Sequence, residues 1–210
     1  MAVEIFDFVL GPIENNTYLV VDNETKNAAI VDPSFDSKNV VEQAMKRGNI
    51  ITQIWCTHAH FDHIIGINEI MPLISPKPVI YLHPDDLPLW NSQGGAKLFG
   101  FPFEIDYQPT HFLMNDDTIN LGQTKISTNL TPGHSSGHVI YYIPEDHVVF
   151  CGDLIFRMSV GRTDLPGGNH QQLIQSIHQA ILNLPDDTRL LSGHGPETTV
   201  GFEKENNPFL

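Results

Sequence analysis

The chain has 210 residues, and its 25 Asp and Glu against 11 Lys and Arg give a formal net charge of -14 at pH 7. Proteins that bind nucleic acids neutralise phosphates with basic surfaces, so this charge argues against a nucleic-acid partner. No apolar stretch reaches the ~18 residues of a transmembrane helix, and the acidic start at residues 1–7 lacks the basic region of a signal peptide. We therefore expect a cytoplasmic protein without membrane association.

The first half of the chain alternates apolar runs with turns. Strands are predicted at residues 3–10, 17–21, 28–31, 50–56 and 79–82. A helix is predicted from residue 36 or 37, where Asp and Ser are good caps, to residue 47, and Gly48 can end it. A second helix is predicted at residues 62–70. A short third helix is expected to begin at Pro84, because proline suits the first helical turn.

The second half begins with a region rich in glycine and proline at residues 93–109, which we expect to form a long loop. Strands are predicted at residues 125–130, 138–143, 147–150 and 189–191. Asn169 is expected to cap a helix, because leucine and isoleucine recur on one face between residues 173 and 184. Strands with interspersed helices and no linker indicate a single layered α/β domain over residues 1–210.

Side chains that can bind a metal are concentrated directly after the strand predicted at residues 50–56. Four of them fall within six residues: His58, His60, Asp62 and His63. In an extended chain, side chains two apart point the same way, so His58 and His60 can reach one ion together. If a helix begins near Phe61, Asp62 and His63 turn towards a second point nearby. The spacing therefore indicates two metals sharing one pocket.

Three further candidate ligands, His134, Asp153 and His194, each follow an apolar, strand-like run later in the chain. Functional groups commonly lie on loops at strand ends, where a rigid scaffold holds them. Imidazole suits zinc or iron, and carboxylate accepts zinc, iron or manganese. We therefore expect all three to join the first cluster.

The pattern His-x-His-x-Asp-His, followed by a distant His, an Asp and a last His, resembles that of the metallo-β-lactamase-fold hydrolases. Within them it is similar to the short prokaryotic glyoxalase II-like group. The likeness covers nearly the whole chain, including residues 11–18, 161–168 and 192–199. It implies an α/β fold, the four-layer αββα sandwich, without the C-terminal helical domain of full-length glyoxalase II.

This resemblance also implies seven ligands for two divalent metal ions. The first ion is held by His58, His60 and His134, the second by Asp62, His63 and His194, and Asp153 bridges both. Zinc is the expected metal, with iron and manganese as alternatives. A metal-bridging hydroxide would attack the carbonyl carbon of a small-molecule thioester, S-lactoylglutathione or similar. Asp62 and Asp153 are the expected catalytic carboxylates.

Arg162 and Arg157 are the candidate substrate-binding residues, because they follow Asp153 closely and glutathione carries carboxylates. Either arginine can instead pair with a local acid such as Asp164. Beyond the candidate ligands, the sequence marks no residue as a general acid that could protonate a leaving group. This favours a thiolate leaving group, which can depart without a proton because thiols have a pKa of ~8.5.

Two alternative hypotheses also account for the metal site. One is a mononuclear iron persulfide dioxygenase, with a single iron on His58, His134 and Asp153. The other is a lactonase or β-lactamase of the same fold, although a β-lactamase is usually exported. The sequence gives no prediction of oligomeric state.

Overall fold

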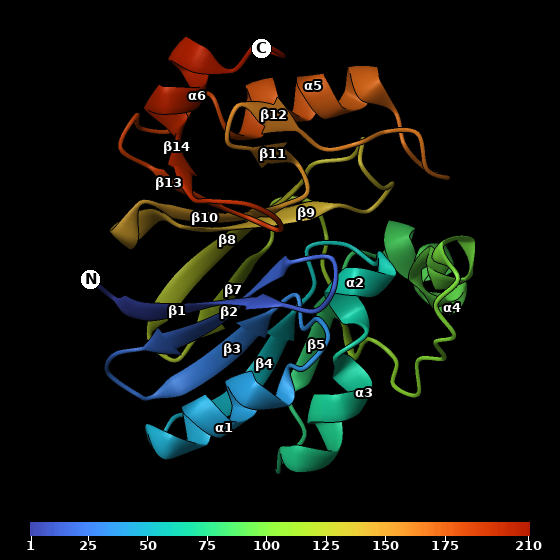
Figure 1. Ribbon diagram of the computed structural model, residues 1–210. Coiled ribbons are helices and arrows are strands. Elements are labelled where there is room, and N and C mark those ends of the chain that lie inside the picture. Colours follow the sequence, from blue (N-terminus) through green and yellow to red (C-terminus); the bar gives the residue numbers. More distant parts are fainter.

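Two six-stranded sheets packed face to face form the centre of the computed structural model, which describes all 210 residues (Figure 1). The first sheet contains, in spatial order, β1 (Val3–Leu10), β2 (Asn15–Asp22), β3 (Asn27–Val31), β4 (Ile50–Trp55), β5 (Val79–Leu82) and β6 (His111–Phe112). Strands β1 to β3 pair antiparallel, whereas β3 to β6 run parallel. Alternation along β1, with an exposed outer side, matches its place at the sheet edge.

The second sheet is mostly antiparallel. Its strands are, in spatial order, β14 (Thr198–Thr199), β13 (Arg189–Ser192), β10 (Val148–Gly152), β9 (Val139–Ile143), β8 (Thr124–Leu130) and β7 (Thr118–Leu121). Only β10 and β13 pair in parallel. A small hairpin, β11 (Ile155–Phe156) with β12 (Ser159–Val160), follows β10 and overlies this sheet (Figure 1).

Helices cover the outer face of each sheet. Figure 1 shows α1 (Lys38–Lys46) and α3 (Ile67–Ile70) against the first sheet, and α5 (His170–Ala180) and α6 (Val200–Asn206) against the second. The short helices α2 (Phe61–Ile64) and α4 (Leu87–Asn91) lie at one end of the sandwich. Short 3-10 turns span Met71–Leu73, Pro84–Asp86, Gln93–Phe99 and Pro144–Asp146. The fold is therefore the four-layer αββα sandwich that the family resemblance implies. None of its helices has the length and apolar character needed to cross a bilayer.

Three apolar clusters hold the four layers together. One lies between the first sheet and its helices, where α1 buries Val40, Val41 and Ala44. The second joins the two sheets, and there Trp55 of β4 stacks on Tyr141 of β9 with 5.1 Å between ring centroids. The third packs α5 and α6 on the second sheet. Because each sheet is covered on both faces, most strand residues are buried, as the apolar runs of the sequence indicate.

The structure departs from the predicted elements in a few places. The helix expected at residues 62–70 is two helices, α2 and α3, because the backbone N–H of Gly66 donates to the carbonyl of Pro33 at 2.9 Å and not within the helix. The approach is close enough to require glycine, since a β-carbon at Gly66 would lie 2.1 Å from the carbonyl oxygen of Ser34. The loop expected at residues 93–109 begins with a 3-10 turn. Helix α6 is not apparent in the sequence, since it is short and depends on its cap, the Thr199 hydroxyl that accepts from the backbone N–H of Phe202.

Candidate metal centre

All seven predicted ligands lie in loops at one end of the sandwich. The loop after β4 carries His58 and His60 and runs into α2, which carries Asp62 and His63. His134, Asp153 and His194 lie just beyond the ends of β8, β10 and β13 respectively. Strand ends from both sheets meet here, so residues far apart in the sequence become neighbours.

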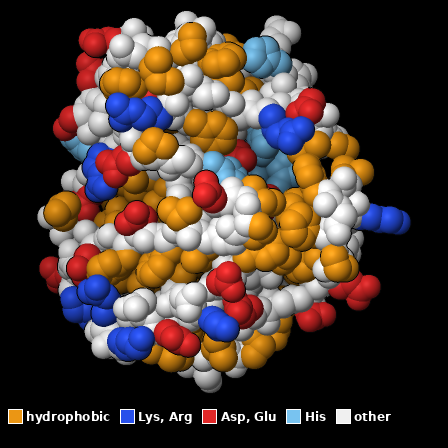
Figure 2. All heavy atoms as spheres, viewed as in Figure 1, with side chains coloured by type: hydrophobic (Ala, Val, Ile, Leu, Met, Phe, Trp, Pro, Cys, Tyr) orange, Lys and Arg blue, Asp and Glu red, His pale blue; other side chains and the backbone are white.

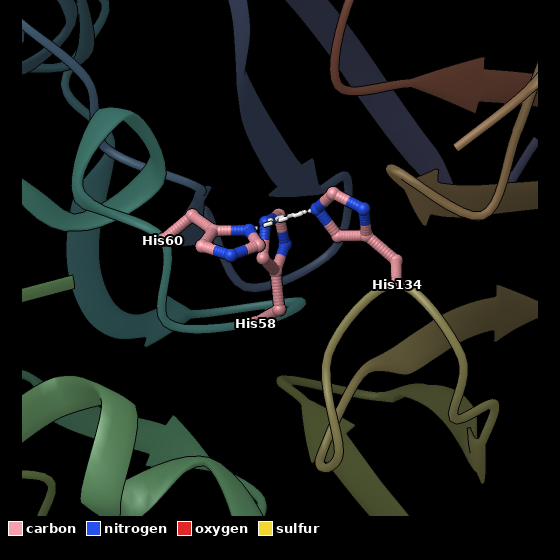
Figure 3. A group of neighbouring side chains, drawn as sticks. All are labelled: His58, His60 and His134. Carbon is pink, nitrogen blue, oxygen red and sulfur yellow. Dashed lines mark hydrogen bonds between the residues drawn. The ribbon is translucent and has the colours of Figure 1, made fainter. Parts of the chain in front are cut away.

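The first cluster consists of His58, His60 and His134, whose ligand atoms all lie within 4.8 Å of one another. Figure 3 shows the rings of His60 and His134 pointing towards each other beside His58. Nδ1 of His60 lies 2.8 Å from Nε2 of His134, which lies 3.2 Å from Nε2 of His58. Burial lowers the pKa of His60 to about 3 and that of His58 well below its usual value. Neutral imidazoles of this kind offer lone pairs to a metal.

The second cluster consists of Asp62, His63 and His194, again with ligand atoms within 4.8 Å of one another. Oδ2 of Asp62 lies 3.3 Å from Nε2 of His194 and 3.6 Å from Nε2 of His63. Burial opposes ionisation of both Asp62 and His63, but neighbouring charges outweigh it. His63 and His194 lower the pKa of Asp62, and the carboxylates of Asp153, Asp62 and Asp32 raise the pKa of His63.

Asp153 lies between the two clusters. Its Oδ2 is 3.5 Å from Nε2 of His134 and 3.8 Å from Nε2 of His194, while its Oδ1 is 3.5 Å from Nε2 of His63. Burial is outweighed by the surrounding histidines, which hold the pKa of Asp153 far below its usual value. Oδ1 is buried and accepts no hydrogen bond from the protein. A buried, ionised oxygen of this kind is costly unless a cation satisfies it, and the donor set fits two divalent ions.

Hydrogen bonds behind the clusters fix the direction of the imidazoles. Nδ1 of His63 lies 3.0 Å from Oδ2 of Asp32, and because a carboxylate only accepts, the ring turns its Nε2 towards the second cluster. Asp32 also accepts from the backbone N–H and the hydroxyl of Thr57, at 2.7 Å each. Asp32, His58 and His63 converge as a third group, but Asp32 is already engaged by these donors. Nδ1 of His134 donates to the carbonyl of Arg162 at 2.8 Å.

Asp86 and His138 also support the centre, and sequence reasoning gave neither a definite role. Asp86 is fully buried and accepts from the backbone N–H of Ala59 at 2.8 Å, the hydroxyl of Ser135 at 2.8 Å and the backbone N–H of Gly137 at 2.6 Å. It therefore joins the loop of the first ligands to the loop of His134. Nε2 of His138 accepts the backbone N–H of Asp153 at 3.2 Å. In the sequence Asp86 is marked only as an acidic residue just after Pro84, where a short helix is expected, and His138 only as the first residue of a predicted strand.

A pocket of about 370 Å³ opens onto the two clusters. Five of the seven predicted ligands line it, while His58 and His63 are fully buried. Its apolar lining residues are Ile13, Phe61, Phe99, Phe156, Val160 and Leu165. Figure 2 shows histidine side chains gathered in a hollow of the surface with hydrophobic side chains around it.

Only one of the two candidate arginines reaches this pocket. Arg162 is among its lining residues, and its exposed guanidinium forms two hydrogen bonds to Asp164, at 2.7 and 2.8 Å. This pairing lowers the pKa of Asp164 to about 2. Arg157 lies outside the lining; its guanidinium carbon sits 4.4 Å from the ring centroid of Phe202 in α6, an attractive cation–π contact. The position of Arg157 therefore gives no support to a substrate contact.

Comparison with known proteins agrees with this fold and site. The model of the Metallo-beta-lactamase superfamily matches residues 10–194, and the chain belongs to that family. The chain is 37% identical over 205 residues to the probable metallo-hydrolase YqgX of Bacillus subtilis, covering 96% of this chain and 94% of that one. It is 31% identical over 211 residues to the hydroxyacylglutathione hydrolase GloC of Haemophilus influenzae, covering 100% and 98%.

Two solved structures resemble the chain over its full length. The crystal structure of the B3 metallo-beta-lactamase BLEG-1 is 38% identical, with a TM-score of 0.89 and 99% of each chain covered. That of TTHA1623 in a di-iron-bound form is 38% identical, with a TM-score of 0.88 and coverage of 98% of this chain and 100% of that one. Family membership and the two clusters identify the chain as a metallo-hydrolase.

Proposed function

We propose that this chain is a dinuclear metal-dependent hydrolase of thioesters, with S-lactoylglutathione or a similar glutathione thioester as substrate. The observation that carries the proposal is the position of Asp153 between two complete three-residue clusters at the floor of a pocket. One carboxylate within reach of both clusters is suited to a shared, two-ion centre. A single-ion site would use only part of this donor set.

In this proposal His58, His60 and His134 would hold one ion, and Asp62, His63 and His194 would hold the other. Asp153 lies within reach of both clusters. When bound, two such ions lower the pKa of a water molecule towards ~7 and polarise a carbonyl oxygen. The protein supplies the orientation. Asp32 holds His63, and Asp86 holds the loops of the first cluster.

The pocket lining favours a leaving group that needs no proton. Apart from the predicted ligands, the only ionisable side chain in the lining is Arg162, which stays protonated because its pKa is raised by Asp164. A thiol has a pKa of ~8.5, so a thiolate can depart unprotonated, whereas an amide nitrogen cannot. Water adds to the carbonyl carbon, the C–S bond breaks with its electron pair going to sulfur, and a carboxylic acid and a thiol result.

Arg162 is the proposed contact for a carboxylate of the thiol portion. Both side chains of the Arg162–Asp164 ion pair are exposed, so exchanging Asp164 for a carboxylate of the substrate costs little free energy. The fork of the guanidinium matches a carboxylate in two-point contact. The name of the Haemophilus influenzae relative supports a glutathione thioester, while that of BLEG-1 makes a β-lactam the substrate to test against it.

The test compares four substrates on metal-loaded protein: S-lactoylglutathione, a β-lactam, a lactone and glutathione persulfide. We expect hydrolysis of the thioester with the highest kcat/KM, loss of it on chelation, and recovery with zinc, iron or manganese at about two ions per chain. His134→Ala should lose activity, whereas His147→Ala, at an exposed histidine paired only with Asp187, should keep it. A fully loaded protein that leaves the thioester intact, or one iron per chain with oxygen uptake on the persulfide, refutes the proposal.

A further inference from the structure

A second cavity, of about 260 Å³, adjoins the metal-site pocket. The two share three lining residues: His60, Phe99 and Leu165. The second cavity is otherwise lined by Leu89, Ser92, Gly94, Gly95, Lys97, Leu98 and Pro166. We call it the apolar arm. Because His60 belongs to the first cluster and lines both cavities, the apolar arm opens beside the metal centre itself.

The lining of the apolar arm suits a hydrocarbon chain. Leucine, phenylalanine and proline make up most of its side-chain surface, and Ser92 and His60 are its uncharged polar members. Its only permanently charged residue is Lys97, which takes part in none of the ion pairs of the structure. A lysine can lay its aliphatic stem along such a surface and keep its ammonium in water. Two of the lining residues, Leu98 and Phe99, are 68% and 41% exposed, so the arm presents apolar surface that a bound ligand would remove from water.

The wall of the apolar arm is held rigidly against the metal ligands. Gly94 has φ of +61°, and a β-carbon there would lie 2.4 Å from the backbone nitrogen of Phe61, the first residue of α2. The ring of Phe99 packs on that of Phe61 with 5.4 Å between centroids. The Gln93–Phe99 turn is therefore seated on the helix that carries Asp62 and His63. A preformed apolar cavity binds a ligand without a cost for ordering its walls.

We propose that the apolar arm binds the acyl chain of the substrate, so that the preferred substrates are thioesters of medium-length, unbranched fatty acids. This inference rests on the proposed thioester hydrolysis. A carbonyl placed at the metal clusters has the apolar arm on the His60 side, and the thiol portion then extends towards Arg162 in the other cavity. The three-carbon lactoyl group would leave most of the arm unfilled.

Acyl-chain length is the variable that tests this inference. The metal-loaded protein is assayed with acetyl, butanoyl, hexanoyl and octanoyl thioesters of glutathione. We expect kcat/KM to rise up to about fourfold for each methylene that leaves water, and to level off once the apolar arm is full. Leu98→Asp should lower the octanoyl-to-acetyl ratio of kcat/KM at least about fivefold. Met114→Asp is the matched control: Met114 is 61% exposed and lines neither cavity, so the ratio should stay unchanged.

A binding measurement separates this inference from the hydrolase proposal. N-methyloctanamide, a neutral probe, is titrated into the zinc-loaded protein while the leucine methyl signals are followed by NMR. Shifts at Leu89, Leu98 and Leu165 support the apolar arm even if no thioester is hydrolysed, in which case only the hydrolase proposal fails. Thioester hydrolysis with a flat chain-length profile and unmoved leucine signals overturns the apolar arm and leaves the hydrolase proposal standing.

Discussion

Asp86→Ala tests how much the hydrogen bonds behind the metal centre contribute to stability and to metal binding. Asp86 accepts three hydrogen bonds, from the Ala59 and Gly137 N–H groups and the Ser135 hydroxyl, and alanine offers these donors no acceptor. Each bond to a carboxylate is worth ~1.5–3 kcal/mol. Burial raises the pKa of Asp86 despite its three donors, so part of this gain is offset by desolvation of the carboxylate. We expect a net loss of about 3–4 kcal/mol in the free energy of unfolding.

Metal binding should weaken as well, because Asp86 fixes the loops on both sides of the first cluster. Removing such an outer hydrogen-bond partner typically costs ~10–100-fold in metal affinity. Urea unfolding of the metal-depleted protein measures the first effect, and competition with a chromogenic chelator measures the second. Asp86→Asn keeps one acceptor oxygen and should lose less of both, so it supplies a folded variant if Asp86→Ala is too unstable.

The neighbouring Asp85 gives the matched control. Its side chain is 60% exposed and its one ion-pair contact is His83 at 3.8 Å, so Asp85→Ala should change the free energy of unfolding by less than about 0.5 kcal/mol. If Asp86→Ala unfolds within about 1 kcal/mol of the wild type and binds metal equally well, the three contacts are not what holds the two loops together.

Three further predictions concern single residues around the centre. Asp153→Ala should cost more kcat than Arg162→Ala, because it releases both clusters whereas Arg162 contacts only the pocket rim; the reverse order in steady-state kinetics would disprove the bridge assignment. Asp32→Ala should lower metal affinity ~10–100-fold by freeing the His63 ring, and equal affinity by chelator competition would contradict this. Gly94→Ala should destabilise the protein by about 2–4 kcal/mol, since its β-carbon meets backbone 2.4 Å away in a left-handed conformation; an unchanged melting temperature would show that the Gln93–Phe99 turn can shift.

The fold was largely predictable, because apolar runs and turn residues mark most of the strands. The predictions at residues 3–10 and 79–82 match β1 and β5 residue for residue. The local sequence pattern gave a wrong prediction where contact with a distant segment determines the secondary structure. The helix predicted at residues 62–70 has a suitable apolar pattern, yet the backbone at Pro33 and Ser34 packs against Gly66 and divides it. The αββα layering itself came from family resemblance, since periodicity does not specify how sheets stack.

The sequence by itself determined which side chains are available for chemistry. Histidine and aspartate at short spacing after an apolar run leave few uses other than metal binding, and that information is local. Tertiary structure alone decided what surrounds them. Asp86 reaches residues 27 and 51 positions away, Arg157 turns to Phe202 and not to the pocket, and the apolar arm forms where the Gln93–Phe99 turn meets Leu165. Such contacts depend on how separate loops pack on a shared scaffold, and no stretch of chain encodes them alone.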